Sequence, residues 1–226
     1  MMQHGAVLRA AGEVDRFPVV LVEVGGLAEQ HLFIACVYSS KTGVWGNLTS
    51  TSVQSKGTFT LYFKGMPSVL VGNSLYWLFD GDFVGIVEFN LERHSLAVIE
   101  VPLDMFERYS GFTLMRAEDG ELSLLSLSGF TAQLWKRNTI TDGVPSWGIV
   151  RTVELDKLLS LDSEGYVTTH GFAEDNNLVI LRVNINIIST VQIESLQFKK
   201  VSDNSKWYYY PFESVYAADY ATSSFP

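Results

Sequence analysis

The chain has 226 residues, of which 47% are hydrophobic and 18% are charged, so it can bury a large core and is not intrinsically disordered. Its formal charge is -9, and the sequence has no cluster of Lys and Arg that could neutralise phosphates, which argues against a nucleic acid or an anionic membrane as partner. The single cysteine, Cys36, excludes an internal disulfide and a multi-cysteine metal site.

The compartment can be predicted from what the sequence lacks. Residues 1–6 have neither the charged start nor the long apolar run of a signal peptide. No stretch approaches the roughly 18 apolar residues of a membrane span. Together with the lone cysteine, these features predict a cytoplasmic or nuclear protein without membrane association.

Short strand patterns dominate the chain. Apolar or aromatic runs, and runs that alternate apolar with polar residues, lie between turn-forming residues such as Gly, Asn and Asp. Such strands are expected, in chain order, within 37–45, 69–71, 75–79, 86–91, 134–135, 149–150, 181–187 and 191–196. Helical signals are restricted to Val153–Leu161, about two turns, and Asp104–Tyr109, about one turn.

The strands recur at a regular interval. A strand, a turn and a large apolar residue that starts the next strand appear four times, with the apolar residue at Trp45, Leu96, Trp147 and Leu196. These positions are 51, 51 and 49 residues apart. A four-stranded antiparallel blade with its turns needs about 40–50 residues, and kelch repeats lie near the upper figure.

This repeat predicts an all-β fold. A single blade cannot bury both of its faces, whereas radial stacking of several blades does so and leaves few long edges exposed. We therefore expect a partial or small kelch-like β-propeller with about four to five blades. A β-sandwich with chance spacing is the alternative, because sandwiches also contain many short strands.

Several of these segments resemble the C-terminal region of F-box proteins from grasses, which carries an F-box-associated, kelch-like β-propeller. The segments are VYSSKTGVWG at 37–46, PSVLVGNSLYWLF at 67–79, EFNLERHSLAVIEVP at 88–102, AQLWKR at 132–137, GFAEDNNLVIL at 171–181 and YYPFESVYA at 209–217. The resemblance implies the target-recognition part of a cullin-type ubiquitin ligase receptor. In that family an N-terminal F-box binds the Skp-type adaptor. Only residues 1–16 precede the first expected strand here, so the adaptor is expected as a partner only of a longer form that has an F-box.

The expected domain organisation has three parts. Residues 1–16 form a poorly ordered lead, 17–217 the propeller and 218–226 a tail. We also hypothesise that Phe17–Val24 pairs with Trp207–Tyr216 and closes the arc of blades, since both would otherwise be exposed strand edges.

The sequence predicts no catalytic residue, no cofactor-binding residue and no metal ligand. The G-x-S-x-G motif of a serine hydrolase and nucleotide-binding glycine loops do not occur, and the four histidines lack zinc-site spacing. The segment Asp80–Gly85 begins like a calcium loop, but Val84 and Leu91 occupy positions that need oxygen ligands. We expect a protein that is not an enzyme.

The sequence offers two kinds of candidate binding residue. Turn residues that precede strands are Gly72, Asn73, Glu118, Asp119, Asp175 and Asn176. Backbone geometry alone explains Gly, Asn and Asp in turns, and an acidic rim for a basic partner is the functional alternative. The segment at 207–212 is rich in aromatic residues, and Tyr208 and Tyr210 would share one strand face as an exposed patch. The predicted function is protein binding to an unknown target. A small-ligand or glycan-binding propeller is the alternative, and a propeller enzyme the least favoured.

Overall fold

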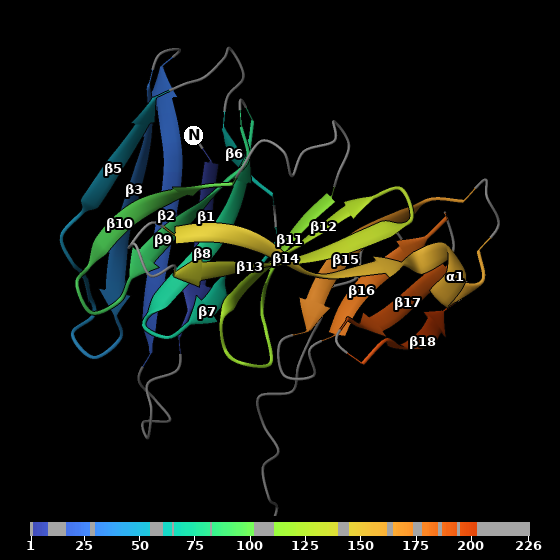
Figure 1. Cartoon of the computed structure of the whole chain (residues 1–226). Coiled ribbons are helices and arrows are strands. Elements are labelled where there is room, and N and C mark those ends of the chain that lie inside the picture. Colours follow the sequence, from blue (N-terminus) through green and yellow to red (C-terminus); the bar gives the residue numbers. More distant parts are fainter. Residues whose placement is uncertain are drawn as a thin grey trace, which may run out of the picture.

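A computed structural model describes residues 2–8, 17–27, 30–54, 61–64, 66–81, 83–101, 111–139, 145–161, 165–173, 178–184, 187–193 and 195–202. Within these ranges the chain forms four antiparallel sheets, which follow one another in sequence order, and one short helix (Figure 1).

The first sheet has the strand order β1-β2-β3-β4, and β5 pairs with β3 as well. Its strands are β1 (Met2–Val7), β2 (Pro18–Leu27), β3 (Gln30–Ser39), β4 (Val44–Trp45) and β5 (Thr49–Gln54). The prediction of a poorly ordered lead is wrong for residues 2–7, because β1 pairs with β2 along its whole length. Ala6 also packs against the core between the first two sheets, which gives this segment a buried side.

The hypothesis that Phe17–Val24 closes an arc of blades needs correction. Residues 18–24 belong to β2, which pairs with β1 on one side and with β3 on the other. Both of its backbone edges are therefore already hydrogen-bonded, and no further strand can pair there. The other half of the hypothesis, 207–216, lies outside the described residues.

The second sheet is the most buried. It contains β6 (Tyr62–Phe63), β7 (Val69–Val71), β8 (Ser74–Asp80), β9 (Gly85–Asn90) and β10 (Ser95–Glu100). Residues 74–79 of β8 are all buried, because Leu75, Trp77 and Phe79 face the first sheet while Tyr76 and Leu78 face the third. A continuous apolar run is the sequence pattern of a strand that is covered on both faces.

The third and fourth sheets have four strands each. The third contains β11 (Gly111–Arg116), β12 (Leu122–Ser128), β13 (Thr131–Thr139) and β14 (Pro145–Glu154), and the fourth contains β15 (Val167–Ala173), β16 (Leu178–Val183), β17 (Ile187–Gln192) and β18 (Gln197–Ser202). Helix α1 (Leu155–Leu159) is shorter than the predicted Val153–Leu161, because Val153 and Glu154 still pair with β13. The predicted turn at 104–109 lies outside the described residues.

The predicted repeat corresponds to one sheet per unit. Trp45 lies in β4, which with β5 pairs along the outer side of β3 in the first sheet. Leu96 and Trp147 lie in the last strands of the second and third sheets, β10 and β14, and Leu196 directly precedes β18. Each interval of about 50 residues therefore spans one complete sheet, which is the length that a propeller blade needs.

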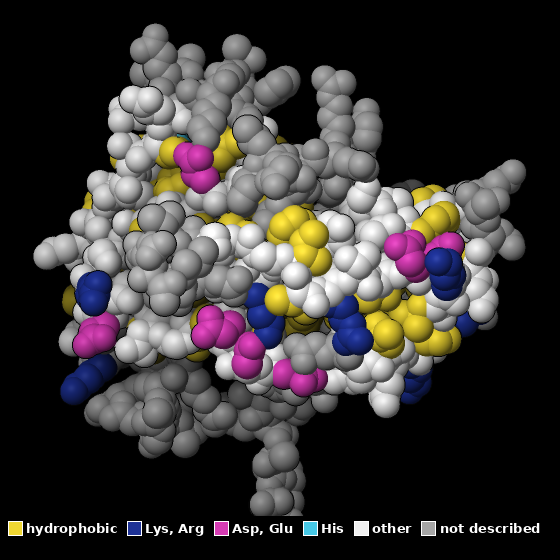
Figure 2. Space-filling model, in the orientation of Figure 1, with side chains coloured by type: hydrophobic (Ala, Val, Ile, Leu, Met, Phe, Trp, Pro, Cys, Tyr) yellow, Lys and Arg dark blue, Asp and Glu magenta, His cyan; other side chains and the backbone are white. Residues whose placement is uncertain are grey.

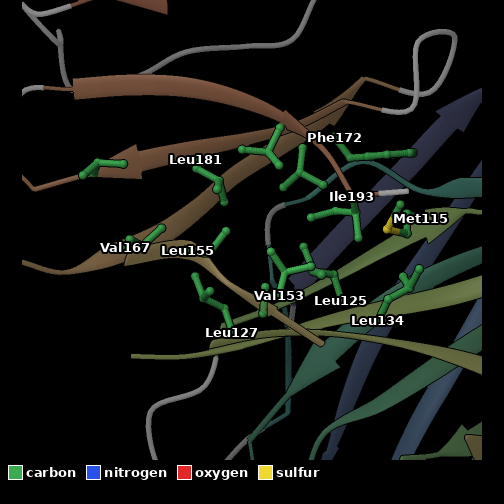
Figure 3. Close-up of a cluster of buried hydrophobic side chains, with 14 residues drawn as sticks. Met115, Leu125, Leu127, Leu134, Val153, Leu155, Val167, Phe172, Leu181 and Ile193 are labelled. Carbon is green, nitrogen blue, oxygen red and sulfur yellow. The ribbon is translucent and has the colours of Figure 1, made fainter. Parts of the chain in front are cut away.

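Successive sheets pack face to face through buried apolar side chains. One cluster joins the first and second sheets, a second cluster the second and third, and a third cluster the third and fourth. Figure 3 shows the third of these clusters, to which Leu125 and Leu134 of the third sheet, Leu181 of the fourth and Leu155 of α1 all belong. Burial of one such side chain contributes about 1.5–3 kcal/mol, so these clusters supply much of the folding free energy.

The first strands of the sheets lie next to one another around a common axis. β1 packs near β6, β7 near β11, and β11 near β15. Within the described residues no comparable packing joins the fourth sheet to the first, and the two lie at opposite sides of the molecule (Figure 1). In the part of the chain that the structure describes, the four sheets thus follow an arc from the first sheet to the fourth. In the described part of the chain no helix is long and apolar enough to cross a membrane.

Candidate functional site

The turns between first and second strands and those between third and fourth strands lie at one end of the sheets, because antiparallel neighbours run in opposite directions. We call this end the turn rim, which is on the lower side of Figure 1. Its described turns connect β3 to β4, β7 to β8, β9 to β10, β11 to β12 and β17 to β18. The candidates Gly72, Asn73, Glu118 and Asp119 all lie on it, and all four are exposed.

Asn73 ties two turns of the second sheet together. Its carbonyl oxygen accepts a hydrogen bond from the Leu91 backbone nitrogen at 2.8 Å, and its side-chain Nδ2 donates to Glu92 Oε2 at 3.4 Å. Gly72 has a positive φ of 57°, which is readily adopted by glycine. Both residues therefore have a structural role in the turn, as the backbone interpretation predicts.

Asp119 holds the turn of the third sheet. Its Oδ1 accepts a hydrogen bond from the Glu121 backbone nitrogen at 3.2 Å, and its Oδ2 forms an ion pair with Lys136 Nζ on β13. The hydrogen bond from Lys136 lowers the pKa of the Asp119 carboxyl, because it stabilises the charged form. The carboxylate is thus committed to Lys136 while half of the side chain remains exposed.

A cleft of about 550 Å³ opens on the turn rim between the third and fourth sheets. We call it the rim cleft; it is lined by Glu118, Leu134, Lys136, Val150, Arg151 and Ser195. The Arg151 guanidinium on β14 donates to the backbone oxygen of Ile193 in the fourth sheet at 3.3 Å, and so connects the two walls. Ser195 Oγ donates to Gln192 Oε1 at 2.7 Å, which holds the β17–β18 turn.

The rim cleft combines charge of both signs with apolar surface. Val150 is 51% exposed, which is unusual for a valine in the middle of a strand. Acidic and basic side chains lie close together along the lower edge of the molecule in Figure 2. A small apolar area surrounded by polar and charged groups is a common composition for a surface that binds protein.

A second polar group lies near the turn rim, on the side of the second sheet that faces the third. Glu88 Oε1 accepts hydrogen bonds from Ser74 Oγ at 2.8 Å and from the Tyr76 hydroxyl at 3.1 Å. Burial is the main cause that raises the pKa of Tyr76, and the Glu88 charge adds to it. Sequence analysis did not identify this group. The alternation of Glu88 and Asn90 with apolar residues places both on one face, but it does not show which sheet they meet.

The opposite end of the sheets has a separate pocket of about 420 Å³. Residues at the starts of β11 and β15 line it together with Lys64 and Asp80, whose side chains form an ion pair at 2.8 Å. The first residue of the rejected calcium loop, Asp80, is thus paired with a lysine. Among the described residues no three His, Cys, Asp or Glu side chains cluster in a way that could hold a metal ion.

The remaining candidates cannot be placed. Asp175, Asn176, Tyr208 and Tyr210 lie outside the described residues, so the turn at 175–177 and the aromatic patch stay predictions.

Four antiparallel sheets whose first strands surround one axis define a β-propeller, as the sequence predicted. Residues 2–216 match the family described as F-box protein AT5G49610-like, beta-propeller, and the chain belongs to that family. This finding confirms the resemblance to the propeller of F-box proteins. The match begins at residue 2, in agreement with the inclusion of β1 in the first sheet. No curated protein matches the chain.

Proposed function

We propose that this chain is a protein-interaction module that binds a target protein at the turn rim, with the rim cleft as the centre of the contact. Membership of an F-box protein propeller family supports an interaction role. The rim cleft is the observation that supports this choice of site. It lies between two sheets and exposes about half of Val150 among charged groups.

The finer proposal is that the target is a substrate of a cullin-type ubiquitin ligase. In such a receptor the propeller selects the substrate and an F-box recruits the ligase through its adaptor. The resemblance to F-box proteins of grasses motivates this step, and under this proposal the adaptor would bind an F-box and not the propeller. The proposed site of action is the cytoplasm or the nucleus.

A matched pair of substitutions on β14 tests the rim cleft. Val150 lines the cleft, whereas its neighbour Ile149, which is 48% exposed, does not. Val150→Glu and Ile149→Glu introduce the same charge at similarly exposed positions one residue apart. Proteins from a cell extract are captured on the wild-type chain and on each variant, and the binding of each captured protein is then measured with purified components.

The proposal expects one target that binds the wild type and the Ile149→Glu variant with similar affinity. Val150→Glu should raise the dissociation constant of that target by at least about tenfold, since hot-spot residues, which contribute about 2 kcal/mol or more, cluster near the centre of an interface. Equal binding by the two variants would exclude the rim cleft as the centre of the contact. A ligase role further requires that the target's cellular half-life depends on a form of the receptor with an F-box.

A binding site for a small polar ligand or a glycan is the second candidate. The pocket at the opposite end favours it, because the Lys64–Asp80 ion pair lines that pocket together with the polar residues Thr168 and Thr169. A glycan array distinguishes the two functions. Specific glycan binding that is lost in Lys64→Met and kept in Val150→Glu would support this second function over the first.

A further inference from the structure

The third sheet ends in a long edge strand. β14 pairs with β13 along one edge, and no described strand pairs with its other edge. The backbone N–H and C=O groups of such an edge can pair with an added strand, and charged side chains commonly prevent this. Residues 145–150 of β14 carry no charge, whereas β18 carries Lys199 and Lys200, and β10 lies near β5 of the first sheet. Among the last strands of the second, third and fourth sheets, β14 is thus the most open to pairing.

A β-bulge lies in the middle of β14. Ile149 pairs with Trp135. Arg151 pairs with the adjacent residue of β13, Leu134, which leaves Val150 as the extra residue. A bulge changes the direction of the side chains beside it, and Val150 and Arg151, although adjacent in sequence, both line the rim cleft. The bulge thus places the open edge of β14 directly beside the rim cleft.

The residues around the bulge make this edge accessible to another backbone. Gly148 lies two positions before the extra residue Val150. Glycine in the interior of a strand often marks a bulge or a place where another backbone approaches closely. Ile149 and Val150 are 48% and 51% exposed. The Ile149 side chain shares a face with Trp135, which packs toward the second sheet, so it points away from the cleft.

The side chains of the rim cleft have few hydrogen-bonding groups left for a target. Lys136 is paired with Asp119, and Ser195 Oγ donates to a neighbouring side chain. Arg151 donates to the Ile193 backbone oxygen at 3.3 Å, but a guanidinium has five donors and can bind a carboxylate as well. A ligand that forms many hydrogen bonds at this place therefore needs the outer edge of the β14 backbone.

We propose that the target binds through an extended segment, which adds as an antiparallel strand to the outer edge of β14. Main-chain hydrogen bonds to residues 146–149 hold the segment, and a side chain that enters the rim cleft beside Val150 gives specificity, as in other cases of strand addition. Antiparallel pairing is chosen because it is slightly more stable per residue than parallel pairing. This inference rests on the proposed function, since it names the kind of segment that the rim cleft binds.

Charge complementarity sets the composition of the segment. Opposite 146–150 it has uncharged residues, of which β-branched and aromatic ones suit a strand best. An acidic residue at its amino-terminal end meets the Arg151 guanidinium, because an antiparallel strand runs in the opposite direction to β14. At about 3.4 Å per residue, a segment of about six residues spans roughly 20 Å, which is the length of the edge from Ser146 to Arg151.

Random peptides of about 12 residues, displayed on phage, test the inference without knowledge of the target, because strands rarely exceed about ten residues. Peptides selected on the wild-type chain should share an uncharged stretch preceded by Asp or Glu. Val150→Glu should raise the dissociation constant of such a peptide by at least about tenfold. Phe198→Glu on β18 is the matched control, since Phe198 is also 51% exposed, and it should leave the constant within about threefold. Circular dichroism spectra of both variants should match the wild type.

Methylation of the backbone nitrogens of a selected peptide tests the pairing itself and leaves the protein unchanged. At alternate residues the methyl group removes an N–H that pairs with β14, which should raise the dissociation constant by at least about tenfold. At the residues between them the N–H points away from β14, and the constant should change by less than about threefold. Failure to select any peptide, binding that ignores Val150→Glu, or methylation effects without alternation would overturn the inference.

The target protein separates a failure of this inference from a failure of the proposed function. A target that weakens in Val150→Glu but is not displaced by the selected peptide keeps the rim cleft and overturns strand addition. A target that binds Val150→Glu as well as the wild type overturns both. Light scattering on the free chain identifies the other possible occupant, because a dimer that the peptide dissociates would show a second copy of the chain on this edge and would also overturn the inference.

Discussion

Gly85 at the start of β9 lies directly against the ring of Phe79, its partner on β8. A Cβ atom added at Gly85 would lie 2.4 Å from Cζ and 2.9 Å from Cε1 of that ring. The ring has little room to move, because Phe79 is fully buried and its centroid is 4.9 Å from the ring of Phe33 and 5.4 Å from that of Phe83. Gly85→Ala therefore forces the centre of the core between the first two sheets to rearrange.

Two opposing terms set the magnitude of this effect. Alanine in a strand is favoured over glycine by about 0.5–1 kcal/mol, because its unfolded chain has less conformational freedom to lose. Extra volume in a close-packed core costs about 1–3 kcal/mol. The middles of these two ranges give an expected net loss of about 1 kcal/mol in the free energy of unfolding, which lowers the Tm of a chain of this size by roughly 2–4 °C.

Gly111→Ala is the matched control. The nearest atom to a Cβ at Gly111 outside its own strand is Thr169 Oγ1 at 3.5 Å, an ordinary contact, so this variant should be at least as stable as the wild type. Thermal and urea unfolding followed by circular dichroism measure both variants. Adding Phe79→Leu to Gly85→Ala should recover part of the loss, because the smaller side chain makes room. A Gly85→Ala variant as stable as the wild type would disprove the packing argument.

Two predictions concern pH. The pKa of Asp119 is lowered by the hydrogen bond from Lys136, so the stability that this pair contributes is present above the ordinary pKa and is lost as the pH falls through the lowered value. Lys136→Met should remove this acid-dependent part, which is less than about 1 kcal/mol for such an exposed pair, and unfolding titrations near pH 3 should show it. Burial lowers the pKa of His4, whose ring lies 5.7 Å from that of Phe63, so the unfolded state binds the proton more readily and stability should decline as the pH falls below 6.5. His4→Gln should make that decline shallower, and an unchanged slope between pH 7 and pH 5 would contradict the assignment.

The sheets and their spacing could be predicted because their signals are local. A turn is predicted from a few adjacent residues, such as Gly72 and Asn73, and a strand from the apolar run on either side of it. The spacing of Trp45, Leu96 and Trp147 then predicts the repeat. Strand β1 was missed for a related reason. Its residues have only a weak strand pattern, and they form a strand because they pair with β2, which lies more than ten positions further along the chain.

The candidate site was predicted only in part. Glu118 was identified as a turn residue, but the walls of the rim cleft come from β13, from β14 and from the turn after β17. The contact from Arg151 to Ile193 spans 42 positions and joins two sheets. Periodicity within a strand shows which side chains share a face, whereas the stacking of sheets decides which faces meet.

The order in which the sheets pack also determines which parts of the chain unfold locally first. Each described sheet packs against its neighbours in sequence, so the second and third sheets each pack against two described sheets, and the first and fourth against one. Stability in such a chain behaves as a sum of unit and nearest-neighbour terms. Amide hydrogen exchange should therefore be slowest in β8 and β12 and faster toward β1 and β18. A sheet emerging from the ribosome can dock on the preceding one at once, without waiting for the rest of the chain.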